Sequence, residues 1–297
     1  MQTTTFVGLD VSRKTIMATA VDPLGHRIEQ RKLTASDSEL VDFLQGLPGE
    51  KKVVLEACNV WEHVYDAAAS TGAQVLLANP LKTRLITEAT LKTDKVDSEA
   101  LAMLGRLDAV AEAYAPTPEQ RALRHLVRER TFYWKKWIDV VNHTYSIMLQ
   151  RGVEYESGIL VKCTRREELR SHHIPEVDRG LDALTKLEEI CKPLDKEVHA
   201  TFVKSQEAQL LATTPGIGEV TAVTLVAFLC PIERFHSLEA VVKYCGLCPS
   251  AIVRSVSCTE KFESMFQASY SFGLSTKACI RLPQLPLARL SKLDCLS

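Results

Sequence analysis

The feature that most restricts the fold of this chain is a set of three short apolar runs, separated by turn-forming residues, near the N-terminus. Runs 6–10, 16–21 and 27–33 have the length and the apolar or β-branched content of strands. Pro23-Leu24-Gly25 lies between the last two as a tight turn. The sequence therefore predicts a three-stranded meander.

Alternating helices and strands are predicted after the meander. A helix over 36–47 with Leu40, Phe43 and Leu44 inward leads to a strand at 53–56, and a helix from Asn59 through Ala69 leads to a strand at 74–78. A meander followed by this alternation is the ribonuclease H-like order. We therefore expect an α/β domain with a mixed sheet and helices on both faces.

Four carboxylates occupy particular places in this predicted domain. Asp10 and Glu56 each end an apolar run, which places them at the ends of buried strands. Asp94 and Asp97 lie three residues apart at the start of a helical pattern, and this spacing puts both on one helix face. The four acids could therefore converge, although each alone is also explained as a turn cap, a surface charge or a helix N-cap.

Convergence of four carboxylates has a chemical consequence, because they cannot all stay ionised at close range unless cations neutralise them. Hard oxygen ligands suit Mg²⁺ or Mn²⁺. Two such ions about 3.5 to 4 Å apart would stabilise the attacking and leaving oxygens of a phosphoryl displacement. The four acids thus predict metal-dependent chemistry on a nucleic-acid backbone.

The composition is that of an ordinary globular protein of about two domains, with 297 residues, 46% of them hydrophobic. No stretch approaches the roughly 20 apolar residues of a membrane span, and residues 1–5 do not resemble a signal peptide, so we expect a cytoplasmic protein without a membrane partner. The nine cysteines are expected to be reduced thiols rather than disulfides. Cys245 and Cys248 form a C-x-x-C without a second pair, and burial as small apolar residues is the favoured interpretation over a zinc site.

A formal net charge of −1 means that nucleic-acid binding must depend on a local basic patch. A long helix starting at a Thr117/Gln120 capping box, with Pro118 in its first turn, and running to about Arg151 supplies one. Its cations and interleaved aromatics could bind phosphates and bases. Equally, the aromatics could pack on a partner helix and the arginines could be solvated. The cations are Arg121, Arg124, Arg128, Arg130, Lys135 and Lys136.

A second helical stretch, 177–212, could pair with the first as an antiparallel hairpin or a coiled-coil dimer arm, and 154–174 between them is predicted to be a loop. Gly216 and Gly218 follow it, at a turn before an apolar helix. Such glycines let the backbone approach a phosphate, as in hairpins that grip DNA, although a structural turn is as common. A further helix is predicted over 235–247.

Taken together, these blocks resemble the DEDD-type transposases of bacterial insertion sequences, which have a RuvC-like N-terminal domain and are guided by an element-encoded bridge RNA. The similar blocks are GLDVS at 8–12, LEA at 55–57, NP at 79–80, KTDKVD at 92–97, PGIG at 215–218, RF at 234–235 and YCGLCP at 244–249. The resemblance implies that Asp10, Glu56, Asp94 and Asp97 bind the metal. It also implies a transposase or recombinase that acts as a homo-oligomer on element ends and target DNA with a guide RNA.

The same family carries a serine nucleophile on a Ser-Gly motif after the Gly-Leu-x-Pro block, and here the chain differs. No Ser-Gly follows Ser250, and residues 251–297 lack helical periodicity. A sequence translated in a shifted reading frame would look like this. We expect a degenerate tail and no covalent DNA adduct.

Two other functions fit the same residues, namely a junction-specific endonuclease that uses the four acids alone and an inactive nucleic-acid-binding remnant. The predicted division is 1–115 (RuvC-like), 116–207 (long helices), 208–250 (small, mostly α) and 251–297 (tail).

Overall fold

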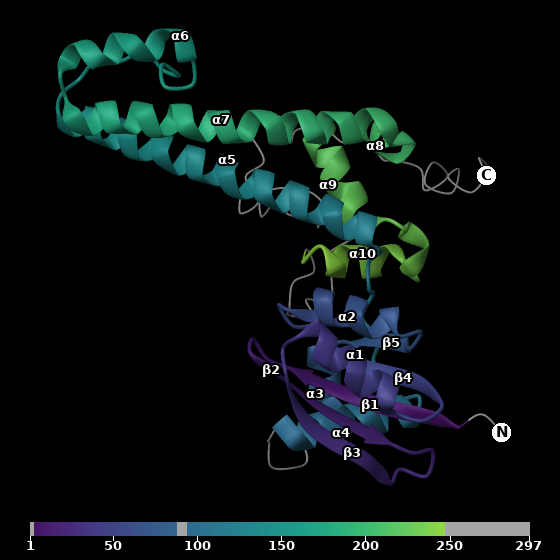
Figure 1. The fold of residues 1–297 in the computed structure, drawn as a ribbon. Helices are drawn as coiled ribbons and strands as arrows, with labels where there is room; N and C mark the ends of the chain where they lie inside the picture. The colour runs from purple at the N-terminus through teal and green to yellow at the C-terminus, as the bar shows by residue number, and fades with distance from the viewer. Residues whose placement is uncertain (1–2, 88–93, 247–297) are drawn as a thin grey trace. The chain divides into compact units, whose positions relative to one another are not determined.

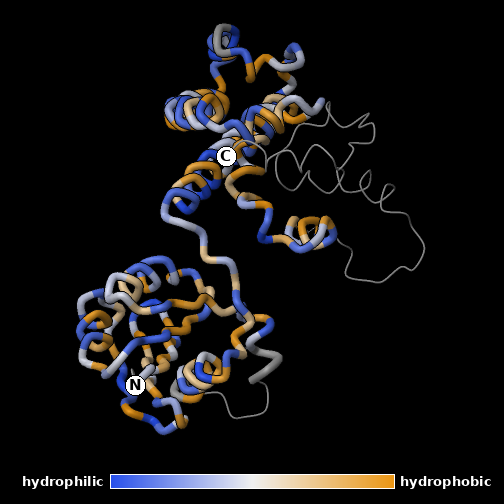
Figure 2. Tube along the Cα trace, turned by 90° about the vertical axis from the view of Figure 1, so that its right-hand side faces the viewer, coloured by the Kyte–Doolittle hydropathy of each residue, from blue (hydrophilic) through white to orange (hydrophobic). Residues whose placement is uncertain are grey.

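The computed structural model describes residues 3–87 and 94–246, and the chain divides into two compact units, one ending at Pro116 and the other beginning at Thr117 (Figure 1). Hydrophobic and hydrophilic stretches alternate along both units (Figure 2), as expected where each element turns one side inward. None of the described helices is both long enough and apolar enough to span a bilayer.

The first unit is built on a five-stranded mixed sheet with the order β3-β2-β1-β4-β5. β1, β2 and β3 form the antiparallel meander, whereas β4 and β5 run parallel to β1. This topology confirms the predicted ribonuclease H-like sheet. The strands are β1 Thr4–Val11, β2 Thr15–Val21, β3 Arg27–Thr34, β4 Glu50–Glu56 and β5 Gln74–Ala78.

Helices cover both faces of the sheet because β1 and β4 are apolar on both faces. Val7, Leu9, Val53 and Leu55 pack in one core with α1 (Asp37–Gly46) and α2 (Trp61–Ser70). On the opposite face Val54 packs with Leu101 of α4 (Asp94–Arg106). α3 (Pro80–Thr87) follows β5 and was not predicted.

The second unit is helical, and its longest elements are α5 (Pro118–Gln150) and α7 (Pro175–Lys204), which pack side by side as a hairpin (Figure 1). The predicted capping box is confirmed, since the Thr117 side chain accepts from Gln120 N and the Gln120 side chain accepts from Thr117 N. A second core joins this hairpin to α8 (Gln206–Ala212) and α9 (Glu219–Leu229). The 3₁₀ turn η2 (Ile232–Arg234) and α10 (Leu238–Tyr244) follow them along the chain.

Three predictions for this unit were wrong in extent. Helix 177–212 is interrupted at Ser205, whose extended backbone ends α7 and whose hydroxyl caps α8 by accepting from Ala208 N. Segment 154–174 contains α6 (Cys163–Arg166) and the 3₁₀ helix η1 (Glu167–His172), because Leu160 and Leu169 are buried in the hairpin core and hold it. Helix 235–247 is reduced to α10, which starts after its cap, Ser237.

Candidate functional site

Asp10 and Glu56 lie at the carboxyl ends of the adjacent parallel strands β1 and β4. The register pairs Leu9 with Leu55, so the next step along both strands brings Asp10 beside Glu56. Both residues are half-buried. Two of the four predicted acids are therefore neighbours in the sheet.

Both acids belong to the sheet face that α4 covers. Side chains alternate along a strand, so Asp10 shares a face with Gly8, and Glu56 shares a face with Val54. A Cβ built at Gly8 would lie 1.9 Å from the carbonyl oxygen of Ser98 in α4, and one at Gly105 would lie 2.7 Å from Val54 Cγ2. Gly8 and Val54 thus contact α4 directly, and Asp10 and Glu56 lie two residues further along the same strands.

The direction of α4 can be followed from the contacts at its C-terminal end. Arg106 donates to the carbonyl oxygen of Pro23, in the turn that follows β2, and Lys52, early in β4, forms an ion pair with Asp108 at 2.7 Å. The C-terminal end of α4 is therefore near the start of β1 and β4. Its first turn, which contains the half-buried Asp97, is directed toward the strand ends that carry Asp10 and Glu56.

Asp94 is the first residue of α4, and its side chain lies outside the described residues. Among the side chains that the structure does describe, no group of three or more His, Cys, Asp or Glu is close enough to hold a metal ion. The donor chemistry nevertheless fits a hard divalent cation, because carboxylates from two strand ends and one helix turn are directed to the same end of the sheet. Asp10 and Glu56 also have further polar interactions within the protein.

Sequence reasoning missed a group of buried hydroxyls next to these acids. Thr19 and Ser98 are fully buried and their side-chain oxygens are 2.8 Å apart, while Gln30 donates to Thr19 at 2.9 Å. The available signals were a threonine among the apolar residues 16–21 and a serine directly after Asp97. These residues link α4 to β2 and β3.

The basic helix α5 uses several of its arginines inside the protein, which corrects the prediction that they form a free basic patch. Arg121 and Arg124 are buried. Arg124 Nε donates to the carbonyl oxygen of Ala227 at 2.8 Å, and the guanidinium groups of Arg124 and Arg128 lie 5.4 and 5.1 Å from the ring centre of Phe228 in α9. Both interpretations of α5 left its arginines accessible, whereas at this end of the helix arginines pack against α9.

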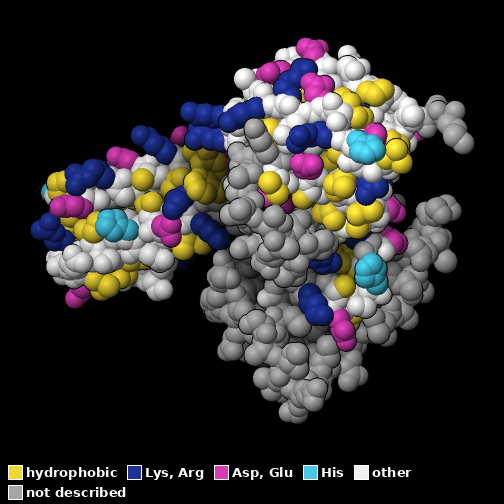
Figure 3. Space-filling view, turned by 90° about the horizontal axis from the view of Figure 1, so that it is seen from below, with side chains coloured by type: hydrophobic (Ala, Val, Ile, Leu, Met, Phe, Trp, Pro, Cys, Tyr) yellow, Lys and Arg dark blue, Asp and Glu magenta, His cyan; other side chains and the backbone are white. Residues whose placement is uncertain are grey.

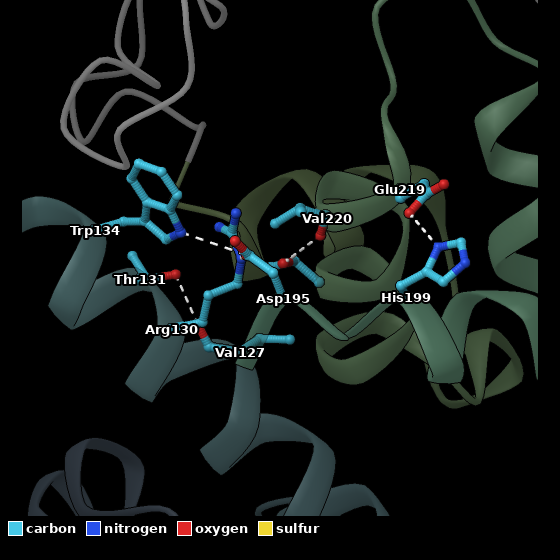
Figure 4. Close-up of polar contacts among 9 residues, drawn as sticks. Val127, Arg130, Thr131, Trp134, Asp195, His199, Glu219 and Val220 are labelled. Atoms are coloured by element: carbon cyan, nitrogen blue, oxygen red, sulfur yellow. Dashed lines mark hydrogen bonds and ion pairs between the residues drawn. The ribbon is translucent and has the colours of Figure 1, made fainter. Parts of the chain in front are cut away.

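Arg130 is also engaged within the unit. Its Nε donates to Asp195 of α7 at 2.6 Å, and the indole N–H of Trp134 is directed at the same carboxylate from 3.4 Å (Figure 4). Lys135, Lys136 and the ring of Phe132, which is 56% exposed, lie on the outer side of α5. Lysine and arginine side chains lie among hydrophobic ones on the face drawn in Figure 3. The exposed basic residues of α5 are thus fewer than the six predicted.

Gly216 and Gly218 form the predicted turn between α8 and α9. Gly216 has φ +92°, a backbone conformation that favours glycine, and Gly218 is the N-cap residue of α9. Glu219, the first residue of α9, accepts a hydrogen bond from His199 Nδ1 at 2.9 Å (Figure 4). A carboxylate at this helix start competes with an anion for the positive end of the helix dipole.

The cysteines show no sign of a metal site in the part of the chain that the structure describes. Burial raises the pKa of the Cys245 thiol, which disfavours the thiolate that a metal requires. Cys248, the other half of the C-x-x-C, lies outside the described residues. Among the described residues, Cys58, Cys191, Cys230 and Cys245 are free thiols.

Two family models match the chain in succession. A model of DEDD-type IS110 transposases matches residues 7–151, and a model described as "Transposase IS116/IS110/IS902 family" matches residues 208–253. The first match contains all four predicted acids, and the second contains the Gly216–Gly218 turn.

Known proteins with related sequences carry compatible names. The chain is 23% identical over 257 residues to the "Transposase for insertion sequence element IS1111A" of Coxiella burnetii, with 82% of this chain and 68% of the relative covered. It is 23% identical over 256 residues to a "Pilin gene-inverting protein" of Moraxella bovis, with 82% and 72% covered. A structure of T. thermophilus RuvC in complex with a Holliday junction substrate aligns with 37% of this chain and 99% of its own, at 13% identity and a TM-score of 0.30. The chain belongs to the IS110 family of DEDD-type transposases, and it is by family a DNA transposase or recombinase.

Proposed function

We propose that this transposase cleaves DNA strands at a divalent-metal site formed by Asp10, Glu56, Asp94 and Asp97. The observation that carries the proposal is the position of Asp10 and Glu56 at adjacent strand ends, on the sheet face toward which the first turn of α4 is directed. Nuclease folds of this type generally use divalent metal, and Mg²⁺ or Mn²⁺ is the ion that four carboxylates suit.

The four acids would bind the metal from different elements of the fold. The backbones of Asp10 and Glu56 are fixed by strand pairing, so the two residues can hold a cation with little loss of backbone freedom. Asp97, with Asp94 one turn earlier in α4, would complete the ligand set from above the sheet. When bound, the metal supplies charge stabilisation to the attacking and leaving oxygens of the scissile phosphate.

Nucleic-acid binding would depend on the exposed side of α5 rather than on the whole helix. Arg128, Lys135 and Lys136 can reach phosphates, and Phe132 offers a ring for base stacking. The turn at Gly216 and Gly218 would bring backbone N–H groups near the DNA backbone, although the neighbouring Glu219 carboxylate opposes a phosphate at this helix start. From the resemblance we also propose a guide RNA, a homo-oligomer and a cytoplasmic site of action.

The test is metal binding together with strand nicking. We expect calorimetric titration with Mn²⁺ to show binding by the full chain and a clear loss in Asp10→Asn and in Glu56→Gln. Asp42→Asn, which removes an exposed carboxylate from α1 on the opposite face of the sheet, is the matched control and should bind as the wild type does. Equal binding and equal nicking by wild type and Asp10→Asn would reject the proposal.

Strand transfer through a serine needs a separate test, because Ser250, Ser255 and Ser257 lie outside the described residues. The protein is incubated with an element end and guide RNA and then denatured. We expect no covalent protein–DNA band. A band that disappears in Ser250→Ala, Ser255→Ala or Ser257→Ala would identify a nucleophile and contradict the interpretation of residues 251–297 as a degenerate tail.

A further inference from the structure

We infer that Gly8, Thr19 and Ser98 act as a brace that fixes the first turn of α4, and Asp97 within it, against the strand that carries Asp10. These three residues are positioning residues and are here called the α4 brace. The inference rests on the proposed metal site and assigns it supporting residues outside the four proposed ligands.

The first component of the brace is the close approach of backbones at Gly8. A Cβ at this position would lie 1.9 Å from the Ser98 carbonyl oxygen and 2.5 Å from Ala102 N. Both of these atoms belong to the helix backbone, which cannot move aside as a flexible side chain can. Glycine at position 8 therefore sets the distance between α4 and β1.

The second component is the hydrogen bond between Thr19 and Ser98. Thr19 lies directly opposite Gly8 in the β1–β2 ladder, and its hydroxyl is 2.8 Å from that of Ser98. Both side chains are fully buried, and Gln30, directly opposite Thr19 on β3, donates to the Thr19 hydroxyl at 2.9 Å. A hydrogen bond shielded from water in this way holds its two partners in a defined geometry.

The position of the brace relates it to the acids. Gly8 is two residues before Asp10 on the same face of β1, and Ser98 is the residue after Asp97. A shift of α4 at Ser98 would therefore move Asp97 relative to Asp10. Residues that orient metal ligands without touching the metal typically change metal affinity by about 10- to 100-fold when they are mutated.

The decisive experiment measures Mn²⁺ affinity of the full chain by calorimetry. Thr19→Val keeps the β-branched shape and removes the hydroxyl, and we expect roughly tenfold weaker binding. Thr19→Ser, which keeps the hydroxyl, should restore most of the affinity. Thr5→Val is the matched control: Thr5 is also buried, and it donates to Pro48 O at 2.7 Å at the other end of β1. It should lower the melting temperature without changing the affinity.

Two further measurements sharpen the result. Gly8→Ala should weaken Mn²⁺ binding more than Thr19→Val, since the helix backbone must move away. In metal-free protein, amide hydrogen exchange in the first turns of α4 should be faster in Thr19→Val than in Thr5→Val. If Gly8→Ala does not fold, the threonine variants still decide the question.

The possible outcomes separate the brace from the metal site. Loss of affinity in Asp10→Asn but not in Thr19→Val would reject the brace and leave the metal site intact. Equal affinity of wild type and Asp10→Asn would reject the metal site, and with it any role of the brace in metal binding. Loss in both Thr19→Val and Thr5→Val would show a general effect of destabilisation and would also overturn the inference.

Discussion

The charged residues of α4 and of α5 look equally functional in the sequence, but the two helices use them differently. In α4, apolar or small residues such as Leu101 and Ala102 pack on the sheet, and Asp94 and Asp97 lie in the first turn, before these packed residues. In α5, Arg121 and Arg124 are themselves buried, and Arg124 contacts α9. A run of charged residues therefore predicts a binding surface only where the apolar residues of the helix already fill its packing face.

The largest effect should come from Asp10→Asn, which tests whether the strand-end acids take part in DNA cleavage. Loss of one ligand removes several kcal/mol of transition-state stabilisation, so we expect metal-dependent nicking to fall by about a thousandfold or more. Single-turnover cleavage of a labelled DNA duplex measures it. A fall of less than about threefold would mean that Asp10 has a structural role, like the arginines of α5.

Arg124→Met tests whether the buried arginines of α5 stabilise the fold. It keeps the aliphatic stem but removes the hydrogen bond to Ala227 O and the contact with the Phe228 ring. We expect the free energy of unfolding to decrease by about 2 kcal/mol. Urea denaturation measures the change, with Lys136→Met as the exposed control on the same helix, for which less than about 0.5 kcal/mol is expected.

Lys135→Gln/Lys136→Gln should reduce nucleic-acid affinity without reducing stability. If both lysines contact phosphates, the slope of log affinity against log salt should flatten by up to about two units. Fluorescence anisotropy with single-stranded and duplex DNA at several salt concentrations gives the slope. An unchanged slope would mean that neither Lys135 nor Lys136 contacts a phosphate.

The smallest effect concerns the thiol of Cys191, buried in α7 near Asp195. Burial raises its pKa, so less thiolate is present at pH 8.5 than in the unfolded chain. Alkylation by iodoacetamide at that pH should be slow in the native protein and fast in urea, as followed by peptide mapping, and should accelerate as the pH is raised. Equal native and unfolded rates would show that the α5–α7 packing opens readily.

The sheet could be predicted because its signals are local. Apolar runs, the Pro23-Leu24-Gly25 turn and the Thr117/Gln120 box each act within a few residues, and the predicted strand ends place Asp10 and Glu56 correctly in β1 and β4. α3 was missed although a signal was present: Asn79 accepts from Leu81 N and Lys82 N as an N-cap, and Pro80 is the first helical residue.

The partners of the basic helix could not be predicted for a different reason. Arg124 meets Ala227 and Arg130 meets Asp195 across separations of 103 and 65 residues, and both contacts depend on how α7 and α9 pack on α5. The brace is also non-local, since Thr19 and Ser98 are 79 residues apart. Periodicity in one segment carries no information about which distant atom will satisfy a buried donor.

The edges of the sheet have a consequence for how this unit can meet other chains. The outer strand β3 carries Arg27, Glu29, Arg31 and Lys32, and charges on an edge strand discourage pairing with another sheet. At the other edge, the segment after α4 lies against β5, with Asn79 N donating to Ala111 O and Ala113 N donating to Leu77 O. Within the described residues, charges on β3 and the chain segment covering part of β5 therefore both disfavour the growth of a continuous sheet between copies of this unit.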